Sequence, residues 1–120
     1  MKGLRSLALK SSDVLALRDF YAALGFVFQE NRVAKGSVVW RGQVGPVELV
    51  LHSGSRRKEE ATPETSFRIQ VEDIAGKITA LRKLGIQIVL DLEFLDDGQT
   101  AVVLDPDGRS VELWAPPQAS

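Results

Sequence analysis

Cysteine is absent from the 120-residue chain, and histidine occurs once, at position 52. The lack of cysteine excludes disulfide bonds, thiolate nucleophiles and cysteine-based metal sites. No apolar run approaches the roughly 20 residues that span a bilayer, and the N-terminal segment lacks the apolar stretch of a signal peptide. The 15 basic and 16 acidic residues form no basic stripe, so nucleic-acid binding has no electrostatic support. We therefore expect a cytoplasmic protein that binds neither membranes nor nucleic acids.

The composition is that of an ordinary globular protein, because 44% of the residues are hydrophobic and 26% are charged. That apolar content is sufficient for a hydrophobic core, and a chain of 120 residues suits one domain. We therefore predict a single domain over residues 1–120.

Within this domain one sequence pattern occurs twice. Asp13 and Gly25 recur 60 residues later as Asp73 and Gly85, in register with the apolar positions around them. The tripeptide at 47–49 (Val-Glu-Leu) recurs at 111–113, four residues out of that register, which predicts a small insertion in the second copy. We predict two modules, about 4–52 and about 66–114, joined by a polar linker at about 53–65.

Each module is predicted to contain a strand, a helix and three further strands. Alternation of apolar and polar residues predicts first strands at about 6–10 and 66–71. Asp13 and Asp73 are suited to cap the helices that follow, and Gly25 and Gly85 to end them in a left-handed conformation. The remaining strands are predicted at about 26–29, 37–41 and 47–52, and at about 87–90, 99–104 and 110–114. The sequence Asp-Pro-Asp-Gly at 105–108 predicts a tight hairpin turn.

The order and spacing of these motifs resemble the vicinal oxygen chelate superfamily, which includes glyoxalase I, bleomycin-resistance proteins and extradiol dioxygenases. The resemblance extends from about Leu4 to Trp114. It implies an α+β fold in which two β-α-β-β-β modules form curved mixed sheets around a cavity, and it implies a homodimer. The matching segments are Asp13, Asp19-Phe20-Tyr21, Leu24-Gly25-Phe26, Val47-Glu48-Leu49 and 105–113.

Metal-dependent members of this superfamily take one ligand each from the first and last strands of both modules. The resemblance implies that Glu48 and Glu112 occupy two of these positions, and that Ser6 and Ser66 occupy the two where histidine is usual. A serine hydroxyl is a poor ligand for a transition metal. His52 cannot replace a missing ligand, because it lies roughly 13 Å along the strand from Glu48. We predict no transition-metal site and no cofactor, with a weakly bound divalent cation as the alternative.

Alternation along the strands assigns a set of polar and aromatic side chains to the cavity. Lys10 and Arg68 are the only cations in that set, so we expect them to pair with the two glutamates or with an anionic ligand. The direction of Trp40 is left open, with core packing favoured. The predicted binding residues are Ser6, Lys10, Glu48, His52, Ser66, Arg68, Glu112 and Trp114.

Three functions remain open, and the sequence does not identify a ligand. The first is a small-molecule-binding protein without a transition metal, whose aromatic or cationic ligand would stack on Trp114. The second is a metal-dependent lyase, isomerase or dioxygenase, in which Glu48 or Glu112 would act as general base and Arg68 or Lys10 would stabilise an enolate. The third is a non-catalytic interaction module.

Overall fold

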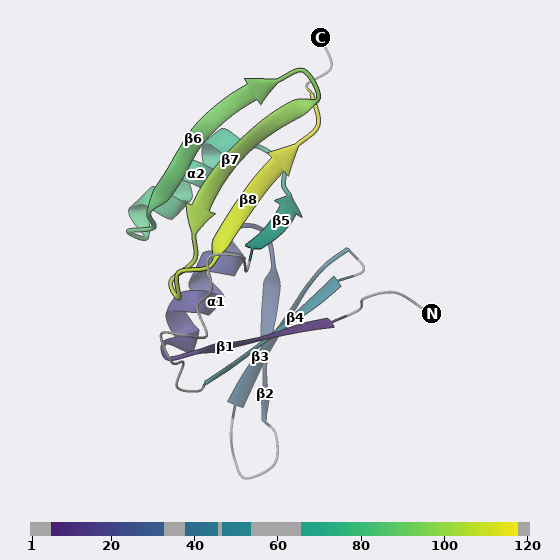
Figure 1. Cartoon of the computed structure of the whole chain (residues 1–120). Helices are drawn as coiled ribbons and strands as arrows, with labels where there is room; N and C mark the ends of the chain where they lie inside the picture. The colour runs from purple at the N-terminus through teal and green to yellow at the C-terminus, as the bar shows by residue number, and fades with distance from the viewer. Residues whose placement is uncertain (1–5, 33–37, 46, 54–65, 118–120) are drawn as a thin grey trace. The chain divides into compact units, whose positions relative to one another are not determined.

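A computed structural model describes residues 6–32, 38–45, 47–53 and 66–117 of the chain (Figure 1). The chain divides into two compact units, residues 1–58 and 59–120. Each unit contains one of the two predicted modules, so the units are described in turn. The predicted linker at about 53–65 lies outside the described residues, apart from Ser53.

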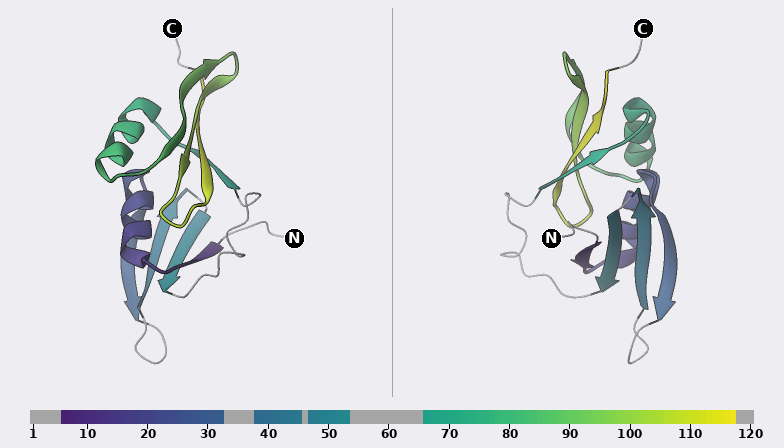
Figure 2. Two further views of the ribbon diagram at one scale, coloured as in Figure 1. Left: turned by 60° about the vertical axis from the view of Figure 1, so that its left-hand side comes forward. Right: turned by 90° about the vertical axis from the view of Figure 1, so that its right-hand side faces the viewer.

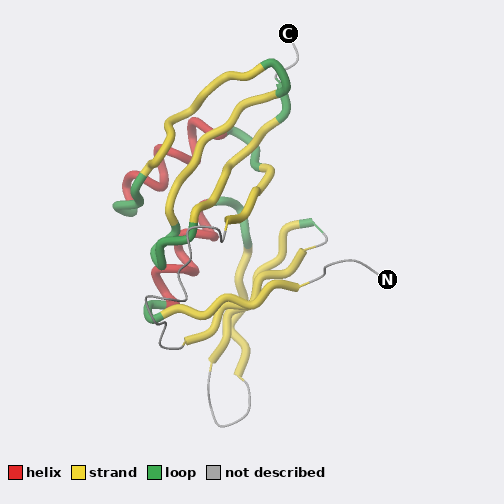
Figure 3. The backbone as a smooth tube through the Cα atoms, viewed as in Figure 1, coloured by secondary structure: helices red, strands yellow, loops and turns green. Residues whose placement is uncertain are grey.

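The first unit is a four-stranded mixed sheet with one helix. Its sheet order is β1-β4-β3-β2; β1 runs parallel to β4, and the other neighbouring strands are antiparallel. The helix follows the first strand directly, as the sequence predicts (Figure 3). The elements are β1 (Ser6–Ser11), α1 (Val14–Ala23), β2 (Val27–Arg32), β3 (Val38–Val44) and β4 (Val47–Ser53).

The second unit repeats this topology. Its sheet order is β5-β8-β7-β6, with β5 parallel to β8. The pairing of β6 with β7 is irregular in two places, and β6 runs five residues beyond the predicted end at 90. The elements are β5 (Ser66–Gln70), α2 (Ile74–Lys83), β6 (Ile88–Leu95), β7 (Gly98–Leu104) and β8 (Ser110–Ala115).

Both helices begin and end where the sequence predicts. The carboxylate of Asp13 accepts a hydrogen bond from a first-turn amide of α1, and that of Asp73 does the same in α2, each at 3.1 Å. Gly25 and Gly85 follow the two helices with φ angles of +117° and +79°. A side chain is disfavoured in this region of φ, so glycine suits the change of direction there.

In each unit the helix packs on one face of the sheet (Figure 2). Alternation predicts which strand residues face the helix, and the burial pattern confirms it. The buried helix residues are Leu17, Phe20 and Tyr21 in α1 and Ile74, Ile78 and Leu81 in α2; the buried strand residues include Leu9, Leu49, Leu51, Val103, Val111 and Leu113. Neither helix is long and apolar enough to cross a membrane, and no other helix lies in the described ranges.

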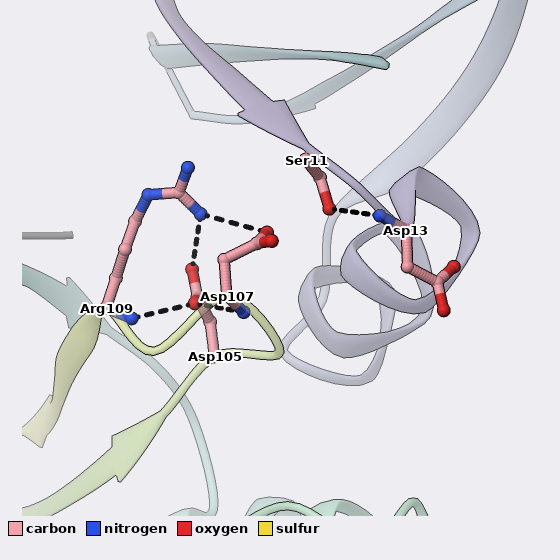
Figure 4. A network of polar contacts seen from close by, with 5 residues as sticks. All are labelled: Ser11, Asp13, Asp105, Asp107 and Arg109. Atoms are coloured by element: carbon pink, nitrogen blue, oxygen red, sulfur yellow. Dashed lines mark hydrogen bonds and ion pairs between the residues drawn. The ribbon is translucent and has the colours of Figure 1, made fainter. Parts of the chain in front are cut away.

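The predicted turn at 105–108 is present and is held by a buried ion pair (Figure 4). The carboxylate of Asp105 accepts hydrogen bonds from the backbone amides of Asp107 and Arg109, both at 2.9 Å. The guanidinium of Arg109 lies 3.0 Å from Asp105 and 3.3 Å from Asp107. This turn joins β7 to β8 through residues 105–109, whereas residues 45–46 join β3 to β4. The predicted insertion in the second module therefore lies in this turn.

Candidate functional site

The predicted binding residues lie on the face of each sheet that does not contact its helix, here called the helix-free face. In the first sheet this face carries Ser6, Lys10, Glu48 and His52, because they alternate with the buried leucines of β1 and β4. In the second sheet the same alternation places Arg68, Glu112 and Trp114 there. Ser66 is described by its backbone, which pairs with Ser110. The two predicted glutamates, Glu48 and Glu112, therefore lie on the helix-free faces of the two sheets.

Glu48 is held by neighbours from both adjacent strands. The Arg41 guanidinium, from β3, donates to Oε1 of Glu48 at 3.2 Å. The Ser6 hydroxyl, from β1, donates to the same oxygen at 3.4 Å. Arg41 is therefore a further cation on the helix-free face. The expectation that Lys10 and Arg68 are its only cations is therefore wrong.

Glu112 is held in a related way. Arg68, from β5, places its Nε 3.1 Å from Oε1 of Glu112, which confirms the predicted pairing of these two residues. The hydroxyl of Thr100, from β7, donates to Oε2 at 3.1 Å. Each glutamate thus contacts one arginine and one hydroxyl. In the first sheet the arginine comes from β3 and the hydroxyl from β1. In the second sheet the arginine comes from β5, the counterpart of β1, and the hydroxyl comes from β7, the counterpart of β3.

The arginine comes from different strands in the two sheets because the first and last strands pair in different registers. In the first sheet Ser6 pairs in register with Glu48. In the second sheet the residue opposite Glu112 is Arg68, and Ser66 lies two positions away, opposite Ser110. Ser6 and Ser66 each lie seven residues before a capping aspartate, which suggests that they are equivalent. The strand pairing differs, however, because Ser6 lies opposite a glutamate and Ser66 does not.

Arg68 also contacts the aromatic side chain of the second sheet. Its Cζ lies 5.0 Å from the centroid of the Trp114 ring, within the range of a cation–π interaction. Gly98 makes room for this ring, because a Cβ there would lie 2.8 Å from the indole Nε1 of Trp114. Arg68, Glu112, Thr100 and Trp114 therefore form one connected group, here called the Arg68 cluster.

The other aromatic candidate lies elsewhere. Trp40 pairs with Leu51, a buried residue of the helix-side core, so its side chain is on the helix side of the first sheet. The guanidinium of Arg18, from α1, lies 4.6 Å from the centroid of its ring. The open question about Trp40 is thus resolved in favour of packing against the helix.

Comparison with solved structures identifies the fold. A glyoxalase/dioxygenase from Nostoc punctiforme matches with a TM-score of 0.74 and 22% identity over 98% of this chain and 92% of that one. A glyoxalase family protein from Enterococcus faecalis matches with a TM-score of 0.64 and 26% identity, over 94% and 97% of the two chains. The fosfomycin resistance protein FosX from Mesorhizobium loti matches with a TM-score of 0.73 and 14% identity, over 96% and 92%.

The chain has the glyoxalase/bleomycin-resistance fold. The resemblance to the vicinal oxygen chelate superfamily and the predicted fold class are therefore confirmed. No protein-family model matches the sequence, and neither does any curated protein. The comparisons thus identify the fold, and the chemistry has to be argued from the residues.

The residues on the helix-free faces do not fit the transition metal that this glyoxalase/bleomycin-resistance fold holds in its metal-dependent members. A guanidinium has no lone pair to donate, and hydroxyls are weak ligands. Within the described part of the chain, no three His, Cys, Asp or Glu side chains cluster closely enough to hold a metal ion. In both sheets the carboxylate is already in contact with an arginine.

Proposed function

We propose that this chain is a small-molecule-binding protein of the glyoxalase/bleomycin-resistance type that works without a transition metal. The observation that carries the proposal is that Glu48 and Glu112 each accept contacts from an arginine and a hydroxyl. Because these partners supply positive charge and hydrogen bonds to each carboxylate, neither glutamate needs a metal ion for that purpose.

The character of the second sheet's helix-free face supports a ligand site. An indole, a cation, a carboxylate and a hydroxyl converge in the Arg68 cluster, beside the apolar side chain of Val102. Ligand sites typically combine apolar surface with a few polar groups that fix orientation. Arg68 is 59% exposed and Glu112 is 40% exposed, so solvent reaches both members of the pair.

The proposal is tested by a thermal-shift screen of small aromatic acids, amides and amines, run with and without a chelator. We expect at least one compound to raise the melting temperature in a concentration-dependent way, since a ligand of the native state stabilises it. We expect the chelator to leave that shift unchanged. A shift that disappears with the chelator and returns with a divalent metal would support the enzyme alternative instead.

That alternative is a metal-dependent lyase, isomerase or dioxygenase with Glu48 or Glu112 as general base. It is supported by the similar structures that are described as glyoxalases or dioxygenases. The contacts of the two carboxylates weigh against it, because a proton abstracted from a substrate would compete with the hydrogen bonds already made there. If no compound of any charge binds, the third possibility, a non-catalytic interaction module, is favoured.

We also propose that the chain forms a homodimer. Strand β6 is the outer strand of the second sheet, and four large apolar side chains on it are exposed: Val89, Leu90, Phe94 and Leu95. An edge strand with exposed apolar residues is a common place for association. Sedimentation at micromolar concentration should yield about twice the 13.1 kDa chain mass, and a monomer would contradict the proposal.

A further inference from the structure

Arg68 already occupies the positions that a cationic ligand would need in the second sheet. Its guanidinium lies over Trp114 and beside Glu112, the two groups expected to attract a cation. A second cation would have to displace Arg68 from the ring and from the carboxylate, and it would meet the repulsion of a like charge. The geometry therefore disfavours the cationic ligand that the sequence suggests.

The free edge of the guanidinium favours a ligand of the opposite charge. Arg68 contacts Glu112 through Nε, and no described residue accepts a hydrogen bond from its two Nη atoms. Two parallel donors at this spacing match the two oxygens of a carboxylate. The indole and Glu112 hold the guanidinium in place from two sides, which reduces the entropy lost when it binds a ligand.

Apolar side chains lie among the residues that pair in register with Arg68 across the second sheet. Arg68 pairs with Glu112 in register, Glu112 with Val102, and Val102 with Leu90. These four residues cross all four strands on the helix-free face, and Leu90 is 57% exposed. A ligand that places its charged group at Arg68 can therefore place an apolar body against Trp114 or toward this row.

From these observations we infer that the Arg68 cluster binds a small organic carboxylate with an aromatic or apolar body. The carboxylate accepts hydrogen bonds from the Nη atoms of Arg68, and the body packs beside Trp114. Glu112 and Thr100 act as positioning residues that orient the guanidinium. This inference rests on the proposed small-molecule-binding function and names the chemical class of its ligand.

Tryptophan fluorescence tests the inference on the full chain. Trp40→Phe removes the other indole, so the signal comes from Trp114 alone. In this background benzoate and phenylacetate are titrated against benzamide and benzylamine, their neutral and cationic counterparts, at constant ionic strength. We expect saturable changes with the carboxylates and none with the amide or the amine.

Two arginine variants locate the binding group. Arg68→Gln should weaken carboxylate binding at least about tenfold, the effect of losing a charge-assisted pair of hydrogen bonds. Arg68→Lys retains the charge but not the paired donors, so its binding should also weaken. Arg82→Gln is the matched control, because Arg82 forms an exposed ion pair with Asp91 in the same unit and should bind carboxylates as the parent does.

Equal binding of benzoate and benzamide, or unchanged binding in Arg68→Gln, would overturn the inference. If amines or amides bind and no carboxylate does, the carboxylate assignment is wrong, but the proposed small-molecule-binding function stands. If no compound of any charge binds, the proposed function fails together with the inference.

Discussion

The buried turn between β7 and β8 yields a stability prediction that can be worked out from its contacts. The side chain of Asp105 is fully buried, and its carboxylate accepts two backbone hydrogen bonds and the guanidinium of Arg109. Asp105→Asn removes the charge but nearly preserves the shape, so Arg109 remains buried with Asp107, at 3.3 Å, as an acidic neighbour. Breaking a buried ion pair on one side typically costs about 3–5 kcal/mol.

Because Asp107 remains beside Arg109, we expect a loss near the lower end, about 3 kcal/mol in the free energy of unfolding. That is a large fraction of the roughly 5–15 kcal/mol that stabilises a natural domain. Urea denaturation followed by circular dichroism measures the change. Asp91→Asn is the control: it removes an exposed ion pair, which should contribute much less to stability than the buried pair at Asp105. A loss below about 1 kcal/mol for Asp105→Asn would refute the reasoning about burial.

Further predictions concern packing and titration. Gly42→Ala places a Cβ 2.5 Å from the ring of Phe28, so it should destabilise the first unit by about 1–3 kcal/mol in urea denaturation, and adding Phe28→Leu should recover part of the loss. A hydrogen bond from the backbone amide of Leu92 and another from Arg82 lower the pKa of Asp91 below its ordinary value. The stability contributed by Asp91 is therefore complete above the pKa of Asp91 in the unfolded chain, and it is lost as the pH falls through the lowered pKa of the folded state. An NMR titration that finds the pKa of Asp91 raised in the folded protein would contradict this.

Features with local causes could be predicted from the sequence. The capping aspartates, the glycines after the helices and the turn at 105–108 depend on residues within one turn of chain, and the structure confirms all of them. Which strand residues face the core follows from alternation, because successive side chains of a strand point to opposite faces. The fold class then follows from the order of these elements, repeated twice.

Features that depend on strand pairing could not be predicted. Arg68 lies opposite Glu112 because of the register between β5 and β8, which lie far apart in the sequence. Spacing within the first strand carries no information about that register. Arg41 was missed for a different reason: it lies within the predicted strand at 37–41, but the direction of its neighbour Trp40 was left open, so Arg41 was assigned to no face. Placing Trp40 on the helix side, as core packing favours, would have placed Arg41 on the opposite face by alternation.

The irregular strand β6 is a third example. The predicted strand ended at about 90, although polar and apolar residues continue to alternate at 91–94. In the structure β6 extends to Leu95, and its pairing with β7 shifts register in two places. Such irregularities are set by the neighbouring strand, which a local pattern does not describe.

We propose that arginines, and not a transition metal, neutralise Glu48 and Glu112 in this chain. The most direct test is the metal content of protein purified without chelators, measured by inductively coupled plasma mass spectrometry and divided by the chain concentration. We expect zinc, nickel, iron and manganese all to be far below one atom per chain. One atom of any of them per chain, retained through extensive dialysis and lost in Glu112→Gln, would contradict the claim.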